Sequence, residues 1–180
     1  MRLLLNETAA VVIDIQEKLF PHMANSEGLL QNNLKLLKGL AMLSVPVIVT
    51  QQYTHGLGPT LKPIIDLFGE FKFTEKISFS CCDEPVFREQ LSVMGRRNIV
   101  LCGIEAHVCV LQTCVDLMEA GFQPVVVEDC VSSRRILDRK VAIDRMAREG
   151  ALITTLESLL FELTRRAGTP VFKSISALVK

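Results

Sequence analysis

Three side chains that could act together in nucleophilic catalysis, Asp14, Lys76 and Cys109, each come just after a short apolar run of the sequence. In an open parallel sheet the binding crevice lies beyond the carboxyl ends of the strands, so side chains at such positions are the first candidates for a site. A carboxylate can take the proton of a thiol, and an ammonium beside both would stabilise the thiolate and orient the carboxylate. The spacing alone does not place Lys76 beside the other two residues.

Each of the three candidates also has a structural interpretation. Asp14 could be a helix N-cap or a solvated strand end, a lone Lys76 is most often an exposed charge, and a cysteine is most often a small core residue. Cys109 is favoured because it follows a strand and a glycine turn at the opening of an apolar helix, where backbone amides lower the pKa of a thiol and can hold an oxyanion. Cys130 follows another apolar run and is a competitor, but the residues after it do not indicate a helix start.

The sequence indicates neither a metal nor a cofactor. The three histidines, His22, His55 and His107, have no spacing that puts two of them on one helical face, and none of the six cysteines forms a CxxC pair. No GxGxxG follows the apolar runs at residues 9–14 and 98–102, so a dinucleotide is not expected either. His107 lies two residues before Cys109, where it could tune the thiol or face solvent, and both interpretations stay open.

The composition is that of a folded protein with a small-molecule partner. At 180 residues the chain fits one domain, which we expect to span residues 1–180. A hydrophobic content of 49% with zero formal net charge excludes disorder and removes the electrostatic reason to expect a nucleic acid or an anionic membrane surface. No apolar run approaches the roughly 18 to 20 residues that a membrane span needs, and the cysteines suit a reducing compartment, so we expect a cytoplasmic protein.

Short β-branched runs alternate with longer amphipathic segments, which is the pattern of parallel strands joined by crossover helices. Strands are predicted at residues 9–14, 46–50, 98–102, 124–128 and 151–154, with a weaker edge strand at 71–74. Helices are predicted at residues 28–43, 85–95, 106–120 and 137–149, and from residues 156 and 170 onward. The fold class is therefore α/β, a three-layer, doubly wound, six-stranded parallel sheet with helices on both faces. The irregular connection at residues 51–70 is long enough to be functional.

Three segments of the chain resemble the isochorismatase-like cysteine hydrolase superfamily, and the similarity runs from about residue 9 to residue 160. They are VVIDIQEKLF around Asp14, EKISFS around Lys76, and LCGIEAHVCVLQTCVDLMEAGFQPVVVEDCVSSR around Cys109, the last being the most specific. Within the superfamily the chain is most similar to the isochorismatase domain-containing subgroup, through QYTHGLGPT at residues 52–60 and GIEA at residues 103–106.

The resemblance implies a site around the three candidates. It implies an Asp14, Lys76 and Cys109 triad, together with a cis peptide bond at Ile104–Glu105 and an oxyanion site at Ile104, Glu105 and Ala106. The substrate-binding residues on this basis are Phe20, Gln52, Tyr53, His55 and Phe79. It implies no metal, because residues 50–53 lack the Asp and His side chains with which nicotinamidases of the superfamily bind one. Ala106 and His107 stand where the superfamily usually has Thr and Asp, so the substrates of its better-known members do not carry over.

The predicted function is cysteine-dependent hydrolysis of an amide or related C–N bond of a small molecule, through a thioester intermediate. The alternative is a non-catalytic binding or interaction protein that keeps the hydrolase fold. We also expect a homo-oligomer, a dimer or a tetramer, because the superfamily is commonly oligomeric and residues 159–161 and 172–179 supply apolar faces near the C-terminus. Such faces could equally pack inside the subunit.

Overall fold

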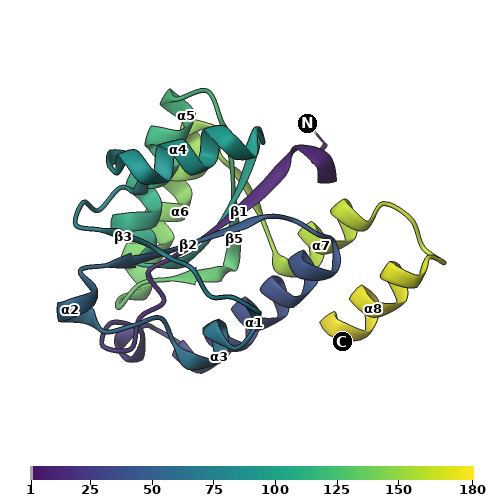
Figure 1. Cartoon of the computed structure of the whole chain (residues 1–180), viewed down its shortest axis with the longest axis horizontal. Coiled ribbons are helices and arrows are strands. Elements are labelled where there is room, and N and C mark those ends of the chain that lie inside the picture. The colour runs from purple at the N-terminus through teal and green to yellow at the C-terminus, as the bar shows by residue number, and fades with distance from the viewer. Residues whose placement is uncertain (1) are drawn as a thin grey trace.

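The computed structural model describes residues 2–180, and its centre is a six-stranded sheet in which neighbouring strands are parallel (Figure 1). The strand order is β3-β2-β1-β4-β5-β6. The strands are β1 (Thr8–Ile13), β2 (Val47–Gln52), β3 (Thr74–Lys76), β4 (Asn98–Ile104), β5 (Gln123–Ser132) and β6 (Leu152–Thr154). The order reverses between β1 and β4, and open α/β sheets form their ligand crevice at such a point.

Helices cover both faces of the sheet, so the molecule has three layers (Figure 1). One face carries α1 (Ser26–Met42), α7 (Leu156–Thr164) and α8 (Pro170–Val179), and the other carries α4 (Pro85–Met94), α5 (Leu111–Glu119) and α6 (Ile136–Glu149). Shorter helical segments are Leu5–Glu7, Phe20–His22, α2 (Thr54–Leu57), α3 (Lys62–Ile65), Cys81–Asp83 and a π-helical turn at Ala106–Val110. The predicted fold class is confirmed.

The two faces of the sheet carry separate halves of the core, because successive side chains of a strand point in opposite directions. In β1, Ala10 and Val12 pack in the layer with α1 and α7, whereas Ala9 and Val11 pack in the layer with α4, α5 and α6. Both faces are covered, which is why the run is continuously apolar. The whole of β1 is buried, and the strand therefore carries the residue that follows it, Asp14, into the protein interior.

The carboxyl ends of β1 and β4 lie close together because residue 103 is glycine. Gly103 has a φ of 110°, and a Cβ atom at this position would lie 2.1 Å from the backbone oxygen of Ile13. Glycine adopts this conformation readily, whereas a residue with a side chain would both be strained and collide with β1. Gly103 thus keeps the segments that lead into Asp14 and Cys109 side by side.

Some element boundaries differ from those predicted. The edge strand expected at residues 71–74 is β3 at Thr74–Lys76, so Lys76 ends the strand instead of following it. Pairing with β2, in which Gln52 lies opposite Lys76, sets this position, and a single apolar run does not reveal such pairing. The helix expected over residues 106–120 begins with the π-helical turn, and the connection expected to be irregular at 51–70 contains the end of β2 together with α2 and α3.

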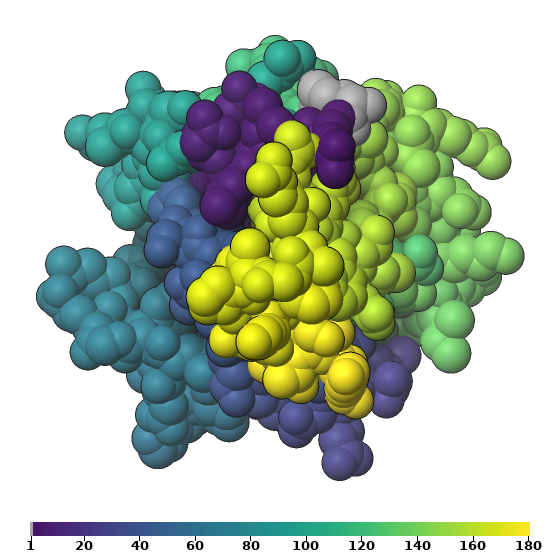
Figure 2. All heavy atoms as spheres, turned by 90° about the vertical axis from the view of Figure 1, so that its right-hand side faces the viewer, coloured from purple at the N-terminus to yellow at the C-terminus, as the bar shows by residue number. Residues whose placement is uncertain are grey.

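The C-terminal apolar faces pack inside the subunit. Helix α8 packs against α1 and α7, and the C-terminal segment lies across one side of the molecule (Figure 2). Leu159 and Leu160 are fully buried, and the rings of Phe161 and Phe172 lie 6.0 Å apart. Of the two interpretations left open for these faces, the structure shows packing inside the subunit. Within residues 2–180, none of the helices combines the length and the apolar character that crossing a membrane requires.

Candidate active site

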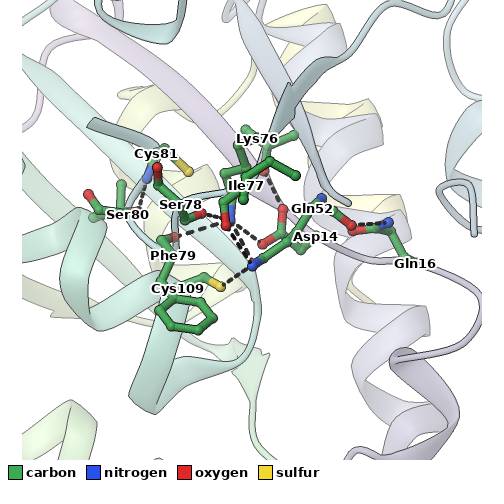
Figure 3. Close-up of polar contacts among 12 residues, drawn as sticks. Asp14, Gln16, Gln52, Lys76, Ile77, Ser78, Phe79, Ser80, Cys81 and Cys109 are labelled. Atoms are coloured by element: carbon green, nitrogen blue, oxygen red, sulfur yellow. Dashed lines mark hydrogen bonds and ion pairs between the residues drawn. The ribbon is translucent and has the colours of Figure 1, made fainter. Parts of the chain in front are cut away.

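Four strands bring polar side chains to the same edge of the sheet. Asp14 follows β1, Gln52 and Lys76 are the last residues of β2 and β3, and Cys109 lies in the π-helical turn that follows β4 (Figure 3). The carboxyl ends of these parallel strands all face the same way, so residues far apart in the sequence meet at the point where the strand order reverses.

A buried ion pair forms the centre of this group. The Nζ atom of Lys76 lies 2.7 Å from Oδ2 of Asp14, and neither side chain has any exposed surface. The other carboxylate oxygen, Oδ1, accepts a hydrogen bond of 2.7 Å from the hydroxyl of Thr50. A charged pair without solvent is tolerated only when its remaining polar atoms are paired as well, and here the carboxylate has both a counter-ion and a neutral donor.

The ammonium of Lys76 is surrounded by oxygen atoms. Besides Asp14, Nζ donates to Oε1 of Gln52 and to the backbone oxygens of Ser78 and Phe79, each at 3.1 Å. Burial is the largest single effect and favours the neutral amine, but the charge and hydrogen bond of Asp14 and the thiols of Cys109 and Cys81 together outweigh it, so the pKa of Lys76 is raised. The residue is therefore an ammonium ion at neutral pH.

The loop after β3 is held in place by Glu84. Its Oε1 accepts hydrogen bonds of 3.1 Å from the backbone amides of Ile77 and Ser78. These bonds, above all those from Ser78, lower the pKa of Glu84, because they stabilise its charged form. The carboxylate thus fixes the loop whose carbonyl oxygens face Lys76.

Cys109 lies next to the ion pair and is only 4% exposed. Its Sγ donates a hydrogen bond of 3.2 Å to Oε1 of Gln52. Burial, followed by the charge of Asp14, raises the pKa of the thiol to about 12, although Lys76 acts in the opposite direction. The net direction is therefore opposite to the lowered pKa that the helix position led us to expect, because the loss of solvent and the nearby carboxylate outweigh the ammonium. The resting residue is a thiol.

The segment between β4 and Cys109 is fixed from the other side by the loop after β5. The peptide bond at Ile104–Glu105 is cis. The Glu105 carboxylate, 6% exposed as a residue, accepts hydrogen bonds of 3.0 and 3.2 Å from the backbone amide and Nε of Arg134. Nδ1 of His107 pairs with the hydroxyl of Ser133 at 2.9 Å, so this half-buried ring is tied to the same loop.

The predicted substrate-binding residues lie in different surroundings. Tyr53 and Phe79 are 52% and 53% exposed and are immediate neighbours of the buried polar group. His55 is exposed on α2, with its ring 6.1 Å from that of Tyr53. Phe20, in contrast, is 5% exposed and packs in the core with α1 and α7. Gln52 faces inward, onto Lys76 and Cys109.

Two members of the group were not among the predicted residues. Thr50, which donates to Asp14, ends a predicted strand, and a buried polar residue at the end of a strand next to β1 is a usable signal. Cys81 is a second, fully buried thiol, whose pKa is raised to about 12 by burial and by the charge of Asp14. Nothing in its sequence neighbourhood places it near Asp14. Within residues 2–180, no group of three or more His, Cys, Asp or Glu side chains is arranged to hold a metal ion.

Comparison with known proteins identifies the family of this chain. The model of the isochorismatase domain matches residues 8–158. The chain belongs to the isochorismatase family. Its relatives include the secreted isochorismatase effector Isc1 of Phytophthora sojae, 38% identical over 99% of this chain and 87% of that protein. Isochorismatase domain-containing protein 1 of Salmo salar is 38% identical over 93% of this chain, which spans only 59% of that longer protein.

Solved structures of the isochorismatase type share the fold. The MAR1 ribonuclease of Caenorhabditis elegans superposes with a TM-score of 0.93, at 36% sequence identity, over 99% of this chain and 92% of that chain. The YcaC gene product of Escherichia coli, described as an octameric hydrolase of unknown specificity, has a TM-score of 0.90 over 99% of this chain and 87% of that chain. At 23% sequence identity, the similarity to the E. coli protein shows a shared fold only.

Proposed function

We propose that this protein is a cysteine-dependent hydrolase that cleaves an amide or related C–N bond of a small molecule through a thioester intermediate. The observation that carries the proposal is the buried ion pair of Asp14 and Lys76 beside the Cys109 thiol. A thiol needs a base to become a nucleophile, and an adjacent carboxylate with a fixed ammonium supplies one. Membership of the isochorismatase family supports a hydrolase.

In the first half of the reaction Asp14 accepts the proton of Cys109, and the sulfur attacks the carbonyl carbon of the substrate. The new C–S bond puts a negative charge on the carbonyl oxygen. The first amides of a helix have no intrahelical acceptor, so those near Ala106 and Cys109 are the proposed donors to this oxyanion. Asp14 then gives its proton to the leaving nitrogen, the C–N bond breaks, and an amine departs.

In the second half, a water molecule attacks the thioester carbonyl while Asp14 takes one of its protons. The C–S bond breaks, the carboxylic acid leaves, and the proton returns to the sulfur of Cys109. Lys76 stays protonated throughout and balances the charge that moves between Asp14 and the thiol. Each proton taken by Asp14 is returned within the cycle, so no other reactant than water is consumed.

The raised pKa of Cys109 defines when the proton moves. Because this pKa lies far above 7, the thiol is almost entirely protonated at neutral pH. A thiolate that forms before the substrate arrives is therefore rare, and proton transfer to Asp14 accompanies the attack. The site resembles a serine nucleophile with its base more than a cysteine that rests as a thiolate.

The test is a hydrolysis screen over small amides, ureides and carbamates with the wild type, Cys109→Ala and Asp14→Asn. Cys114→Ala is the matched control, because Cys114 is also a buried thiol but lies in the core on α5. We expect Cys109→Ala and Asp14→Asn to lose at least about 10³-fold in kcat/KM on any substrate found, and Cys114→Ala to keep its activity. Full turnover by Cys109→Ala would overturn the mechanism.

RNA belongs in the same screen, because the C. elegans relative is described as a ribonuclease. Cleavage of RNA that does not depend on Cys109 would assign a different chemistry to this fold. A wild type that binds a small molecule and turns over none would support the alternative, a binding protein with a hydrolase fold.

We further propose that the protein is a homo-oligomer, as the E. coli structure of the same fold is described to be. Exposed apolar side chains at Ile136, Leu137 and Val141 on α6, at 72%, 68% and 58%, offer a surface for such contacts. Light scattering after gel filtration gives the mass directly, and a monomer at micromolar concentration would contradict this part of the proposal.

A further inference from the structure

Gln52 makes contacts that differ from those of a substrate-binding side chain. Its Oε1 accepts two hydrogen bonds, one of 3.1 Å from Nζ of Lys76 and one of 3.2 Å from Sγ of Cys109 (Figure 3). Its Nε2 donates to the backbone oxygen of Ile77 at 3.1 Å. The carbonyl end of the amide is thus directed at the proposed nucleophile, and the other end at the loop after β3.

The orientation of this amide is fixed. A flipped amide would turn its NH₂ group toward the ammonium of Lys76 and its oxygen toward the carbonyl oxygen of Ile77, so both contacts would become repulsive. The backbone is fixed too, because the amide of Gln52 donates to Oε1 of Gln16 at 2.7 Å and its carbonyl accepts from Nε2 of Gln16 at 3.0 Å. Gln16 is fully buried and also donates to the backbone oxygen of Gly58 at 2.7 Å.

The ammonium of Lys76 has enough hydrogen-bond acceptors without Gln52. An ammonium has three protons, and Asp14 and the backbone oxygens of Ser78 and Phe79 already supply three acceptors. Cys109 has fewer partners, because its Sγ donates to Oε1 of Gln52 and the other acceptor that acts on it is the carboxylate of Asp14. The energetic effect of the Gln52 carbonyl therefore falls mainly on the thiol.

We propose that Gln52 is a positioning residue that keeps the proton of Cys109 on sulfur in the resting site, until Asp14 takes it during attack on the substrate. A carbonyl oxygen stabilises an S–H group by accepting its hydrogen, and it repels the thiolate that remains when the proton has left. The proton must therefore turn from Gln52 toward Asp14 before the sulfur can attack. The meaning of this resting state rests on the proposed function, but the contact itself can be tested without a substrate.

The test measures the pH dependence of Cys109 alkylation by iodoacetamide, read cysteine by cysteine through peptide mass spectrometry. Gln52→Met keeps the length of the side chain and removes the acceptor. One hydrogen bond of ordinary strength corresponds to about one pKa unit, so we expect the apparent pKa of Cys109 to fall by about one unit. At any pH below both values the thiol should then react about tenfold faster than in the wild type.

Gln52→Glu is the conservative variant, since it keeps an oxygen at the same place and can add negative charge. It should leave the apparent pKa of Cys109 at the wild-type value or raise it. The other titratable groups that act on this thiol, Asp14, Lys76 and Cys81, are unchanged in every variant. A loosened site would shift both variants in the same direction, whereas the proposed contact shifts them differently.

Gln51→Met is the matched control. Gln51 is the neighbouring residue on β2, is 1% exposed, and bonds to Thr60 and Thr54 instead of the thiol. Its variant should reproduce the wild-type profile of Cys109. The proposal is wrong if Gln52→Met follows the wild-type profile, if Gln51→Met shifts as much as Gln52→Met, or if Gln52→Glu lowers the pKa. The alkylation experiment needs no substrate. It can therefore refute the role of Gln52 even if Cys109→Ala abolishes hydrolysis, and it can support that role even if Cys109→Ala keeps full activity.

Discussion

Replacing Lys76 with methionine removes the counter-ion of a carboxylate that has no exposed surface. At an effective dielectric constant of about 20, unit charges 2.7 Å apart attract each other by about 6 kcal/mol. Part of this attraction is offset by the cost of taking both ions out of water, and the measured loss on removing one partner of a buried pair is about 3 to 5 kcal/mol. We expect Lys76→Met to lower the free energy of unfolding by that amount, because Thr50 alone remains to stabilise Asp14.

The assay is urea unfolding followed by circular dichroism, with the wild type, Lys76→Met, Asp14→Asn and the double variant. In the double variant no unpaired charge is left in the interior, so its loss should be smaller than the sum of the two single losses by about 2 kcal/mol or more. Lys72→Met is the control, since the pair of Lys72 and Glu70 is 3.1 Å long but 77% and 79% exposed. An exposed pair contributes about 1 kcal/mol at most. If the loss of the double variant equalled the sum of the two single losses, Asp14 and Lys76 would not stabilise each other as expected.

Three further predictions concern the surroundings of this pair. Thr50→Val removes the 2.7 Å hydrogen bond to Asp14 and should destabilise the protein by about 1.5 to 3 kcal/mol in urea unfolding, as expected for a bond to a charged group. Gly103→Ala should cost about 3 kcal/mol or more, because the new Cβ would meet the backbone of Ile13 and the chain could adopt its φ only with strain. The pKa of Lys76 is raised above its ordinary value of 10.5, so its contribution to stability is complete below about pH 10.5 and is lost as the pH rises through the folded-state pKa. The melting temperature of the wild type should therefore fall more steeply above pH 10.5 than that of Lys76→Met.

Each of these predictions has a control in the same chain. Thr50→Ser keeps the hydroxyl and should restore most of the stability that Thr50→Val loses. Gly95→Ala adds a methyl group at a φ of 58° where no atom lies within 4 Å, so its cost should stay well below that of Gly103→Ala. Equal losses at the two glycines would show that strain, and not the approach to β1, decides the effect. If the melting temperatures of the wild type and of Lys76→Met fell equally steeply at alkaline pH, the alkaline loss of stability would not be due to Lys76.

The order of strands and helices could be predicted because both faces of the sheet are covered. Strands buried on both sides need continuous apolar runs, and these stand out against the amphipathic helices between them. The same logic singled out Asp14 and Cys109, since Asp14 lies at the end of one such run and Cys109 lies at the helix opening after another. The edge strand was harder to locate, because pairing with β2, and not apolar content, decides that β3 ends at Lys76.

The contacts inside the site were not predictable from spacing. Thr50 and Gln52 reach Asp14, Lys76 and Cys109 only through the register between parallel strands, which one sequence does not contain. Whether the pKa of the Cys109 thiol is raised or lowered depends on the balance between burial and the nearby charges. The position of Cys109 at a helix opening does not show how deeply the thiol is buried. The hydrogen bonds of Gln52 to Lys76 and Cys109 change its interpretation from a contact of the substrate to a contact of the proposed nucleophile.

The most direct test of the central proposal is to trap the acyl group on Cys109. A substrate from the screen is mixed with enzyme in excess, the reaction is quenched in acid within the first turnover, and the protein is analysed by intact and peptide mass spectrometry. We predict an added mass equal to the acyl group, located on Cys109, removed by neutral hydroxylamine and absent from Cys109→Ala. An unmodified Cys109 throughout the first turnover, together with full activity of Cys109→Ala, would contradict the proposed mechanism.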